Sequence, residues 1–442
     1  KICFRLIPIC IYIFFQIMAV NFYNSNELNM DSFNQELTED QRLMKQSCRD
    51  FIDRVVSPFL REDWQREWNM DPDERLPKEI LKAADEISIR TLGVPEKYGG
   101  IELNAETENR SFAIIAEEIA RGDSGLADKL VQNWKVSVLL RNLAPEHLQE
   151  KWFTRLVEDH TFLLAHCLTE PKGASDRWLP YNVPEAAMDT MAKKVDGGWK
   201  INGRKHYISN GFDAGLYVVY ANTKPGSGML EGTSSFLVPR DNPGLEIVRC
   251  NETIGCRFMN NGEIYFSDCF VPDDHLLSEG KALSKAAIYF RPGKIIQAAK
   301  NLGVGVAAFE KTSAFVQSYE RGGKLLIKHQ SVASRLADMA TRITSVRTLV
   351  NQAALAVDTR SSDADALCNM AKVFASQQIL KVCENALELH GGMGAMLDVG
   401  IEKLFRDASI FLHMDATVDI SHFKIVKAMF PETAGKYAGK ET

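Results

Sequence analysis

The feature that most limits the fold of this 442-residue chain is a block of short β-rich runs between two long helical regions. Apolar residues recur at helical spacing from about Leu37 to Glu158, and again from about Ala282 to Phe430. Between them, from about Thr161 to Leu277, short runs rich in β-branched and aromatic residues are bounded by turn residues. We therefore expect helices, then a compact antiparallel sheet or barrel, then helices.

Local signals place several element ends within this order. Thr38 and Gln41 match a capping box at the start of the first helix, and the glycines of HGGMG (390–394) should stop a late one. The predicted domains are 37–160, 161–281 and 282–442, with 1–36 as an uncertain N-terminal extension. The predicted strands lie in GGWKINGRKHYIS, GLYVVYANT, SSFLVPR, LEIVRC and GEIYFSDCFV.

Composition excludes several classes of protein. Apolar residues make up 45% and charged residues 25% of the chain, the balance of an ordinary globular protein, and a net charge of -6 gives no reason to expect nucleic acid as a partner. The nine cysteines are scattered and never spaced CxxC, which argues against a disulfide framework and against a metal site. We expect a reducing, cytoplasmic location.

The first twenty residues, KICFRLIPICIYIFFQIMAV, qualify that location. Two cations precede an apolar run of signal-peptide length, so that a signal or membrane anchor is one interpretation. No clear small-residue cleavage site follows, and Met18 or Met30 would serve as the true start. We favour a segment that is not native; membrane association and organelle targeting stay open.

Two polar stretches of the β region, LTEP (168–171) and GRKHYISNG (203–211), carry the main candidates for ligand binding. Thr169 and Ser209 supply hydroxyls, and Tyr207 supplies a ring on which a flat cofactor could pack. The alternative is that they are ordinary strand residues. HGGMG does not follow a predicted strand, so it is not a dinucleotide-binding loop of the GxGxxG type.

Taken together, these segments resemble the acyl-CoA dehydrogenase family of flavoproteins. LTEPKGASD is similar to the TEPxAGSD stretch of the family, INGRKHYISNG to NGxKxWITNG, and LELHGGMG with RDASIFLHMDAT to the glycine turn and RDAxIxxIYEGT. The resemblance runs from about Leu37 to Phe430. It implies an N-terminal helical domain, a middle β-domain, a C-terminal four-helix bundle and bound FAD, with a homotetramer in which a neighbouring subunit completes the adenine site.

The resemblance also implies roles for individual residues. Thr169 and Ser209 would hydrogen-bond the flavin, Tyr207 would pack on it, and His166 and Leu168 would give main-chain contacts. The remaining implied cofactor contacts are Arg321, Glu388, Gly391, Gly392 and Thr417, and the implied substrate contacts are Ser175 and Met414.

Asp415 is the predicted catalytic base, although most members of the family have Glu there. A minority carry the base on an earlier helix, where this chain has Ile295, which cannot titrate. Ile410, Phe411 and Met414 suggest an apolar setting that would make the carboxylate a stronger base. The alternative is that Asp415 only turns the chain before the next helix.

Three further departures bear on substrate and assembly. The segment 176–202 is about eight residues longer than expected, and with the shorter carboxylate it suggests a branched, cyclic or otherwise bulky acyl group. ERGGKLL (320–326) is short for the family, which weakens the contact expected of Arg321. Glu388 stands where Asn or Gln is usual.

The expected reaction is α,β-dehydrogenation of an acyl-CoA thioester in fatty acid metabolism, with an acceptor such as electron-transfer flavoprotein. One alternative is a flavin oxidase resembling nitroalkane oxidase, whose base is an aspartate at this position but whose partner arginine is His422 here. The other is a non-catalytic member kept for assembly.

Overall fold

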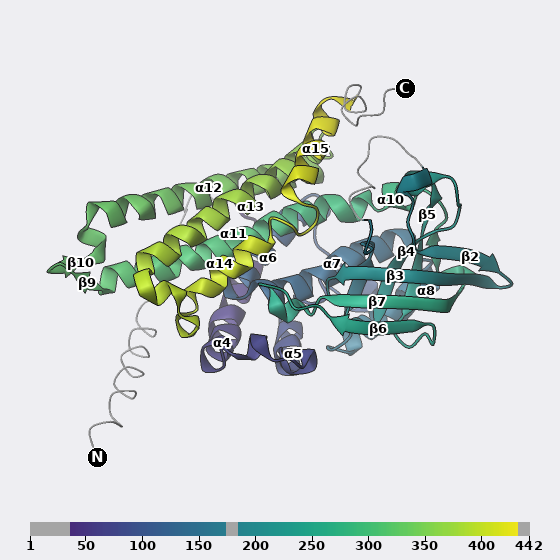
Figure 1. Cartoon of the computed structure of the whole chain (residues 1–442), viewed down its shortest axis with the longest axis horizontal. Helices are drawn as coiled ribbons and strands as arrows, with labels where there is room; N and C mark the ends of the chain where they lie inside the picture. Colours follow the sequence, from purple (N-terminus) through teal and green to yellow (C-terminus); the bar gives the residue numbers. More distant parts are fainter. Residues whose placement is uncertain (1–35, 174–183, 432–442) are drawn as a thin grey trace, which may run out of the picture.

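The structure is a computed structural model that describes residues 36–173 and 184–431. N-terminal helices, a β-sheet and a long helical bundle follow one another along the chain, as the sequence predicts (Figure 1). Ser175 and the first part of the lengthened 176–202 segment lie outside the described residues. No helix of the described ranges is long and apolar enough to cross a membrane.

The N-terminal helices begin with the predicted capping box. The Thr38 hydroxyl accepts from the Gln41 amide, and the Gln41 side chain accepts in return from the Thr38 amide, which satisfies two backbone donors at the helix start. The helices of this region are α3 (Glu39–Phe51), α4 (Ser57–Glu62), α5 (Lys78–Glu86), α6 (Glu108–Gly122), α7 (Ser124–Leu143) and α8 (Glu146–Glu158).

Within the described residues, eight strands form the middle sheet, in the order β6-β7-β3-β2-β4-β5-β8 with β1 beside β4. The pairing is antiparallel except that β1 and β2 each run parallel to β4. All five predicted runs form strands, whereas β1, β2 and β8 lay outside the predicted runs. The strands are β1 (Leu164–Cys167), β2 (Met191–Val195), β3 (Gly198–Ile208), β4 (Leu216–Asn222), β5 (Thr233–Pro239), β6 (Leu245–Cys250), β7 (Gly262–Pro272) and β8 (Leu276–Ser278).

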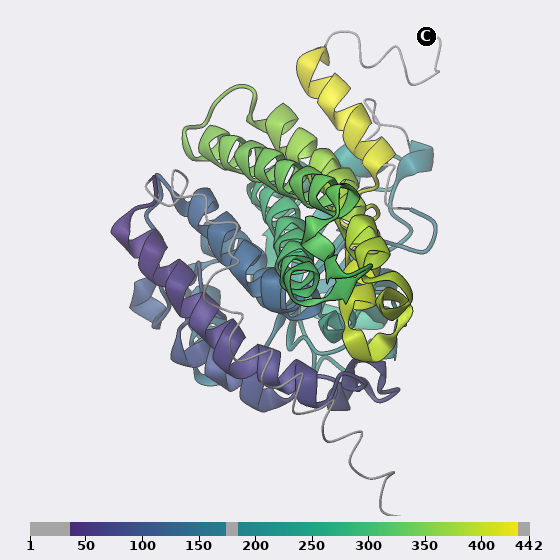
Figure 2. The ribbon, with the colours of Figure 1, turned by 90° about the vertical axis from the view of Figure 1, so that its left-hand side faces the viewer.

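The C-terminal helices pack side by side, and their long axes run away from the sheet (Figures 1 and 2). A short hairpin, β9 (Glu320–Arg321) and β10 (Lys324–Leu325), turns the chain between the first two long helices. The predicted stop is confirmed, because α13 ends at His390 before the glycines. The helices are α10 (Ala282–Lys285), α11 (Ala287–Ser318), α12 (Gln330–Asp358), α13 (Ala364–His390), α14 (Ile401–Ile410) and α15 (Val418–Met429).

The N-terminal helices and the bundle share one hydrophobic core. Its buried residues run from Cys48 to Phe411, and α6 lies directly against α11. At Gly303 on α11 an added Cβ would come within 2.2 Å of the Glu117 carbonyl on α6, so only glycine permits this approach. A second core joins α7 and α8 to the sheet, and both α7 and α11 contribute buried residues to each of the two cores.

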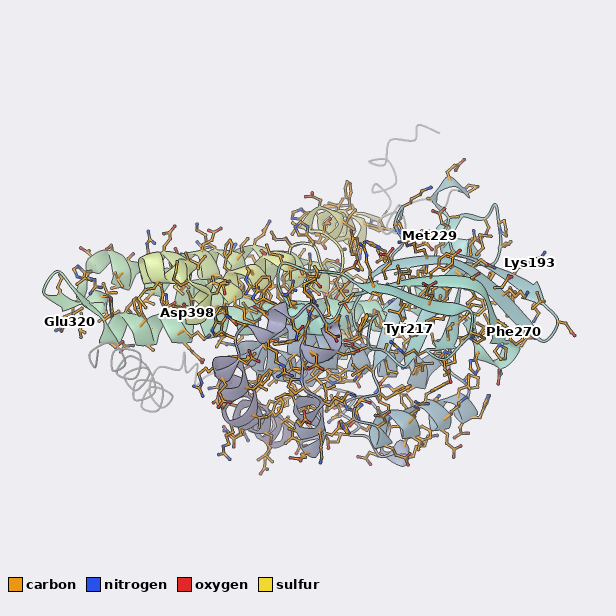
Figure 3. All side chains as sticks on the ribbon, turned by 60° about the horizontal axis from the view of Figure 1, so that its bottom comes forward. Lys193, Tyr217, Met229, Phe270, Glu320 and Asp398 are labelled. Carbon is orange, nitrogen blue, oxygen red and sulfur yellow. The ribbon has the colours of Figure 1, made fainter. Side chains whose placement is uncertain are left out.

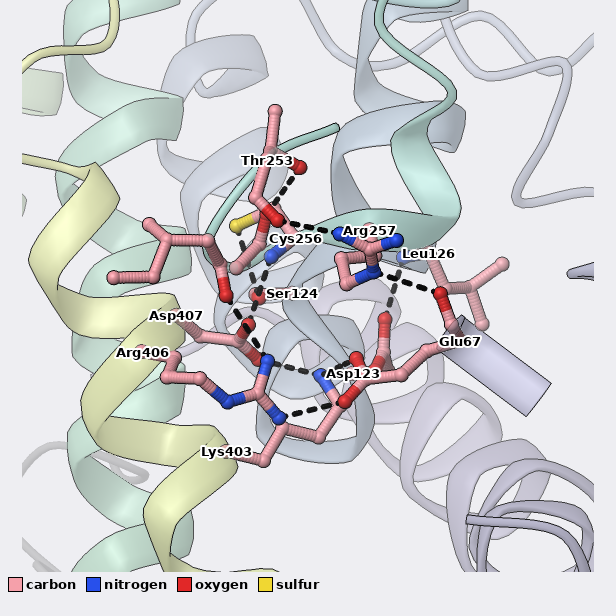
Figure 4. A network of polar contacts seen from close by, with 12 residues as sticks. Glu67, Asp123, Ser124, Leu126, Thr253, Cys256, Arg257, Lys403, Arg406 and Asp407 are labelled. Atoms are coloured by element: carbon pink, nitrogen blue, oxygen red, sulfur yellow. Dashed lines mark hydrogen bonds and ion pairs between the residues drawn. The ribbon is translucent and has the colours of Figure 1, made fainter. Parts of the chain in front are cut away.

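A buried cluster of ion pairs, which we call the junction, ties α14 to the rest of the molecule (Figure 4). The Lys403 ammonium lies 2.8 Å from Asp123 at the start of α7, 2.6 Å from Asp407 and 3.5 Å from Glu67. Burial opposes the charge on Asp407, but Lys403 holds the pKa of that carboxyl below its usual range. The junction thus fixes the direction in which α14 leaves the core.

The same cluster reaches the β-domain. The Cys256 amide donates to Asp407 at 2.8 Å, and the Cys256 thiol lies 3.1 Å from the Ser124 hydroxyl. Arg406 donates to Glu67 at 2.6 Å. Three segments that are far apart in sequence therefore meet at α14, one turn and a short loop before Asp415.

Candidate active site

A cavity of about 690 Å³ lies where α7, α11, the β-domain and the loop after α14 come together. Eight of the residues proposed from the sequence line it, although they come from segments separated by up to about 250 positions. These eight are His166, Leu168, Thr169, Tyr207, Ser209, Met414, Asp415 and Thr417. The structure thus brings the candidate base together with the candidate flavin contacts.

The four other described candidates do not line this cavity. Arg321 lies beside Glu320 at the far end of the bundle, opposite the sheet residues Lys193 and Phe270 (Figure 3). Gly391 and Gly392 follow the end of α13, where an added Cβ would meet nothing within 4 Å. Among the described residues no atom comes close to this side of either glycine, so their contacts with a cofactor stay a prediction.

Local contacts at this far end are with the chain itself. Glu388 forms an ion pair with Arg335 on α12, and the Arg321 guanidinium packs over the Tyr319 ring at 4.2 Å. Gly391 has a φ of +59°, a conformation that favours glycine for backbone reasons alone. The contacts of Glu388 and Arg321 with a cofactor therefore stay a prediction.

The cavity wall from the β-domain fits a flat ring with a polar edge. Thr169 and Ser209 line it, and among the described residues their side-chain hydroxyls have no hydrogen-bond partner, which leaves both groups for a ligand. Tyr207 has a φ of +58° and is 65% exposed at the same wall. A large aromatic side chain held out of the core beside two open hydroxyls is the arrangement that flavin binding requires.

The loop that carries Asp415 has an unusual backbone. Asp415 and Ala416 have φ values of +51° and +86°, both in the left-handed region that favours glycine. Lys372 on α13 donates to the carbonyl of Ala416 at 2.7 Å and to that of Leu412 at 3.4 Å, and Ser376 donates to Phe411 at 3.1 Å. These bonds from α13 hold a conformation that the loop sequence alone does not favour.

The predicted apolar setting of Asp415 is wrong. The Lys135 ammonium lies 3.5 Å from the Asp415 carboxylate. The charge of Asp415 also interacts with Lys372 and Lys300, where it opposes the lowering of each pKa by burial. Burial disfavours the charge on Lys135, but Asp415 and then Tyr289 more than offset it and raise the pKa of Lys135. The candidate base therefore faces cations from three helices as well as the apolar residues of its own loop.

Sequence reasoning missed these lysines because they come from three different helices. Lys135 is on α7, Lys300 on α11 and Lys372 on α13, so no local motif joins any of them to Asp415. A signal was nevertheless present, since each lysine interrupts an apolar helical run, and a buried cation there needs a partner. Burial lowers the pKa of Lys372 to about 8, and the charge of Asp415 opposes that shift.

Comparison with known proteins assigns the family. Family models described as the N-terminal, middle and C-terminal domains of acyl-CoA dehydrogenase match residues 38–160, 165–269 and 284–429.

The chain belongs to the acyl-CoA dehydrogenase family. It is an oxidoreductase of this family, whose cofactor is FAD.

Individual relatives resemble this acyl-CoA dehydrogenase over most of their length. A cyclohex-1-ene-1-carbonyl-CoA dehydrogenase of Syntrophus aciditrophicus is 30% identical over 85% of this chain and 86% of that one. The structure of butyryl-CoA dehydrogenase from Megasphaera elsdenii matches with a TM-score of 0.79 and 27% identity, over 89% of this chain and 99% of that one. A structure from work on the electron transferring flavoprotein of Acidaminococcus fermentans matches with a TM-score of 0.81 and 26% identity. The match covers 90% of this chain and 99% of that one.

Proposed function

We propose that this protein dehydrogenates an acyl-CoA thioester between its α- and β-carbons and that Asp415 is the base. The single observation that carries the proposal is the position of Asp415 in one cavity with Thr169, Ser209 and Tyr207. When bound, FAD supplies an acceptor for the hydride that leaves the β-carbon. Asp415 takes the α-proton, and the two carbons become doubly bonded.

The neighbouring lysines give the carboxylate a defined role in this reaction. Lys135, at 3.5 Å, is an ion-pair partner of the Asp415 carboxylate. Lys372 holds the carbonyls on either side of Asp415 and thereby aims the side chain into the cavity. We assign substrate contact to Met414 at the cavity wall and, from the resemblance, to Ser175.

A branched or cyclic acyl group is the finer proposal for the substrate. The Syntrophus relative is named for a cyclic substrate, and that relative is 30% identical to this chain. The Asp side chain, shorter than Glu by one methylene, also suits an α-carbon held closer to the loop backbone. We propose that the reaction takes part in the breakdown of fatty or alicyclic acids. We also propose a cytoplasmic location, and electron-transfer flavoprotein as the electron acceptor.

A homotetramer, or at least a dimer, is proposed on two observations. Arg321, Glu388, Gly391 and Gly392 lie away from the cavity, so a cofactor that touched all the candidates would have to lie between copies. On α15, Phe423 and Met429 are more than half exposed, which is costly unless another surface covers them. Light scattering of the FAD-loaded protein tests this proposal, and a stable monomer would refute it.

A second candidate function is a flavin oxidase that acts on nitroalkanes. The partner arginine expected for that activity is His422 here, but Lys135 supplies a cation 3.5 Å from the aspartate. Oxygen uptake with nitroethane, absent with any acyl-CoA, would favour this candidate.

The test is anaerobic bleaching of the flavin spectrum by a panel of straight, branched and cyclic acyl-CoA thioesters. Purified full-length protein should carry noncovalent FAD and bleach with at least one thioester. Protein that binds no flavin after reconstitution would instead support a non-catalytic assembly role. Bound flavin that no thioester reduces would reject the proposed dehydrogenation.

A further inference from the structure

The floor of the cavity is polar where a hydrocarbon pocket would be apolar. Asp128, Gln132 and Lys135 lie at positions i, i+4 and i+7 of α7, on one face, and all three line the cavity while being nearly buried. Across from them α11 contributes Tyr289 and Gln297. Such a floor costs free energy unless its polar atoms find partners.

Some of these atoms are paired within the chain. The Gln132 amide donates to the Tyr289 hydroxyl at 3.1 Å, and Lys135 lies over the Tyr289 ring at 5.1 Å as well as beside Asp415. Lys300, on the same face of α11 as Gln297, forms an ion pair with Oδ1 of Asp128. These contacts pair the polar atoms just named, but two other polar atoms of the floor stay without a hydrogen-bond partner within the described ranges.

Two buried atoms of the floor have no hydrogen-bond partner among the described residues. They are Oδ2 of Asp128, an acceptor, and Nε2 of Gln297, a donor. Their side chains are 3% and 2% exposed, and both residues line the cavity. Leaving either buried atom unpaired costs about 1 to 3 kcal/mol.

We propose that this cavity accepts an acyl group bearing a hydroxyl on a carbon remote from the thioester. A hydroxyl both donates and accepts hydrogen bonds, so its chemistry matches an acceptor such as Oδ2 of Asp128 and a donor such as Nε2 of Gln297. The inference rests on the proposed dehydrogenation and adds the chemical class of the acyl group.

The charges around the floor argue against other substituents. Lys135 and Lys300 lie beside Asp415 and Asp128, so charges of both signs face the cavity. A second carboxylate on the acyl chain would meet the unpaired oxygen of Asp128, and an amine would meet the two lysines. A plain hydrocarbon would leave both unpaired atoms without partners. A hydroxyl can hydrogen-bond such atoms, whereas a methylene cannot.

The experiment compares three thioesters with the same ring. Anaerobic flavin reduction is followed with cyclohexane-1-carbonyl-CoA and with its 4-hydroxy and 4-carboxy derivatives. We expect kcat/KM for the hydroxylated thioester to exceed that for the unsubstituted one by about tenfold to a hundredfold. Equal values for the two, or a preference for the carboxylated thioester, would overturn the inference.

A variant ties the preference to the floor. Gln297→Leu keeps the volume and removes the donor, so the ratio of hydroxylated to unsubstituted kcat/KM should fall toward one. The control is Gln378→Leu on α13, whose amide is engaged by Arg342 outside the cavity, and it should keep the ratio. An unchanged ratio in Gln297→Leu counts against the inference even if the parent prefers the hydroxyl.

The outcomes separate this inference from the proposed function. Flavin reduction by the unsubstituted ring or by a straight-chain thioester, without preference for the hydroxyl, rejects only the hydroxyl-bearing substrate. No reduction by any thioester, with FAD bound, rejects the dehydrogenation and the inference together.

Discussion

Two clusters of buried charge lie along the same elements, and they differ in how completely their atoms are paired. In the junction, at the start of α7 and on α14, Oε2 of Glu67 and Oδ2 of Asp123 have no hydrogen bond among the described residues, but each lies within 3.5 Å of the Lys403 ammonium. In the cavity, Asp128 lies between one and two turns further along α7 and Gln297 lies on α11, and each keeps one buried polar atom without a hydrogen-bond partner within the described ranges. A cluster whose buried charges contact one another stabilises the fold, whereas a cluster that leaves polar atoms without a partner is available for a ligand.

Substitution of the candidate base should give the largest effect and should act on rate alone. Asp415→Asn preserves the shape of the side chain but cannot take a proton, so flavin reduction should fall by about two to four powers of ten while flavin binding survives. Stopped-flow measurement with the best thioester tests this. Asp419→Asn, an exposed change at the start of α15, is the control. A normal rate in Asp415→Asn would place the base elsewhere.

Loss of a carboxylate in the junction should act on stability instead of on rate. Asp407→Ala removes the acceptor for both Lys403 and the Cys256 amide, which leaves a buried cation partly uncompensated. We expect a loss of about 3 to 5 kcal/mol in the free energy of unfolding, measured by urea titration. A variant as stable as the parent, but with slow chemistry, would contradict the assignment of the junction to structure.

The pH dependence of stability should have opposite signs in the two clusters. Burial raises the pKa of the Cys256 thiol, so above about pH 9 the unfolded chain loses a proton that the folded chain keeps, and stability falls. Burial lowers the pKa of Lys372 to about 8, so between pH 8 and about 10.5 the unfolded chain binds more protons, and stability rises. Each group contributes about 1.4 kcal/mol per pH unit within its range.

Two variants separate these contributions. Urea titrations from pH 7 to 10 should show a flatter decline in Cys256→Ala and a steeper one in Lys372→Met than in the parent. Parallel curves for the parent and Lys372→Met would mean that the lysine is not held uncharged in the folded state at high pH.

The smallest effect is expected at the unpaired donor. Gln297→Leu replaces a buried amide that lacks a partner for Nε2 with an apolar group of similar size. The ligand-free protein should gain about 1 kcal/mol in the free energy of unfolding. A loss of 2 kcal/mol or more in the free energy of unfolding would show that the amide already has a partner, and would reject the cavity floor as a binding site.

The sequence was informative where short segments act alone. The capping box at Thr38, the stop before Gly391 and the five β-rich runs depend on neighbours within a few residues, and all are present. β1 was missed because its four residues are all buried and therefore lack the alternation that marks a half-buried strand. The lengthened 176–202 segment lies in part outside the described residues, so its bearing on the size of the acyl group stays a prediction.

The motifs selected residues that line one cavity, but they did not predict the charge of that cavity. Thr169, Ser209 and Asp415 each lie within a recognisable segment. The apolar residues beside Asp415 in sequence, however, make up only part of its surroundings in space. What surrounds it, notably Lys135 and Lys372, depends on how α7 and α13 pack against the loop. Long-range packing of this kind has no signature within a window of ten or twenty residues.

The junction also has a consequence for how this protein can evolve. Its paired charges are drawn from the N-terminal region and from α14 of the bundle, so neither region carries the whole set (Figure 4). Exchange of one of these regions with that of a distant homologue would leave unmatched charges at a buried site. Recombination should therefore be tolerated only between parents that share Glu67, Asp123 and Lys403, so the N-terminal region and the bundle are inherited together.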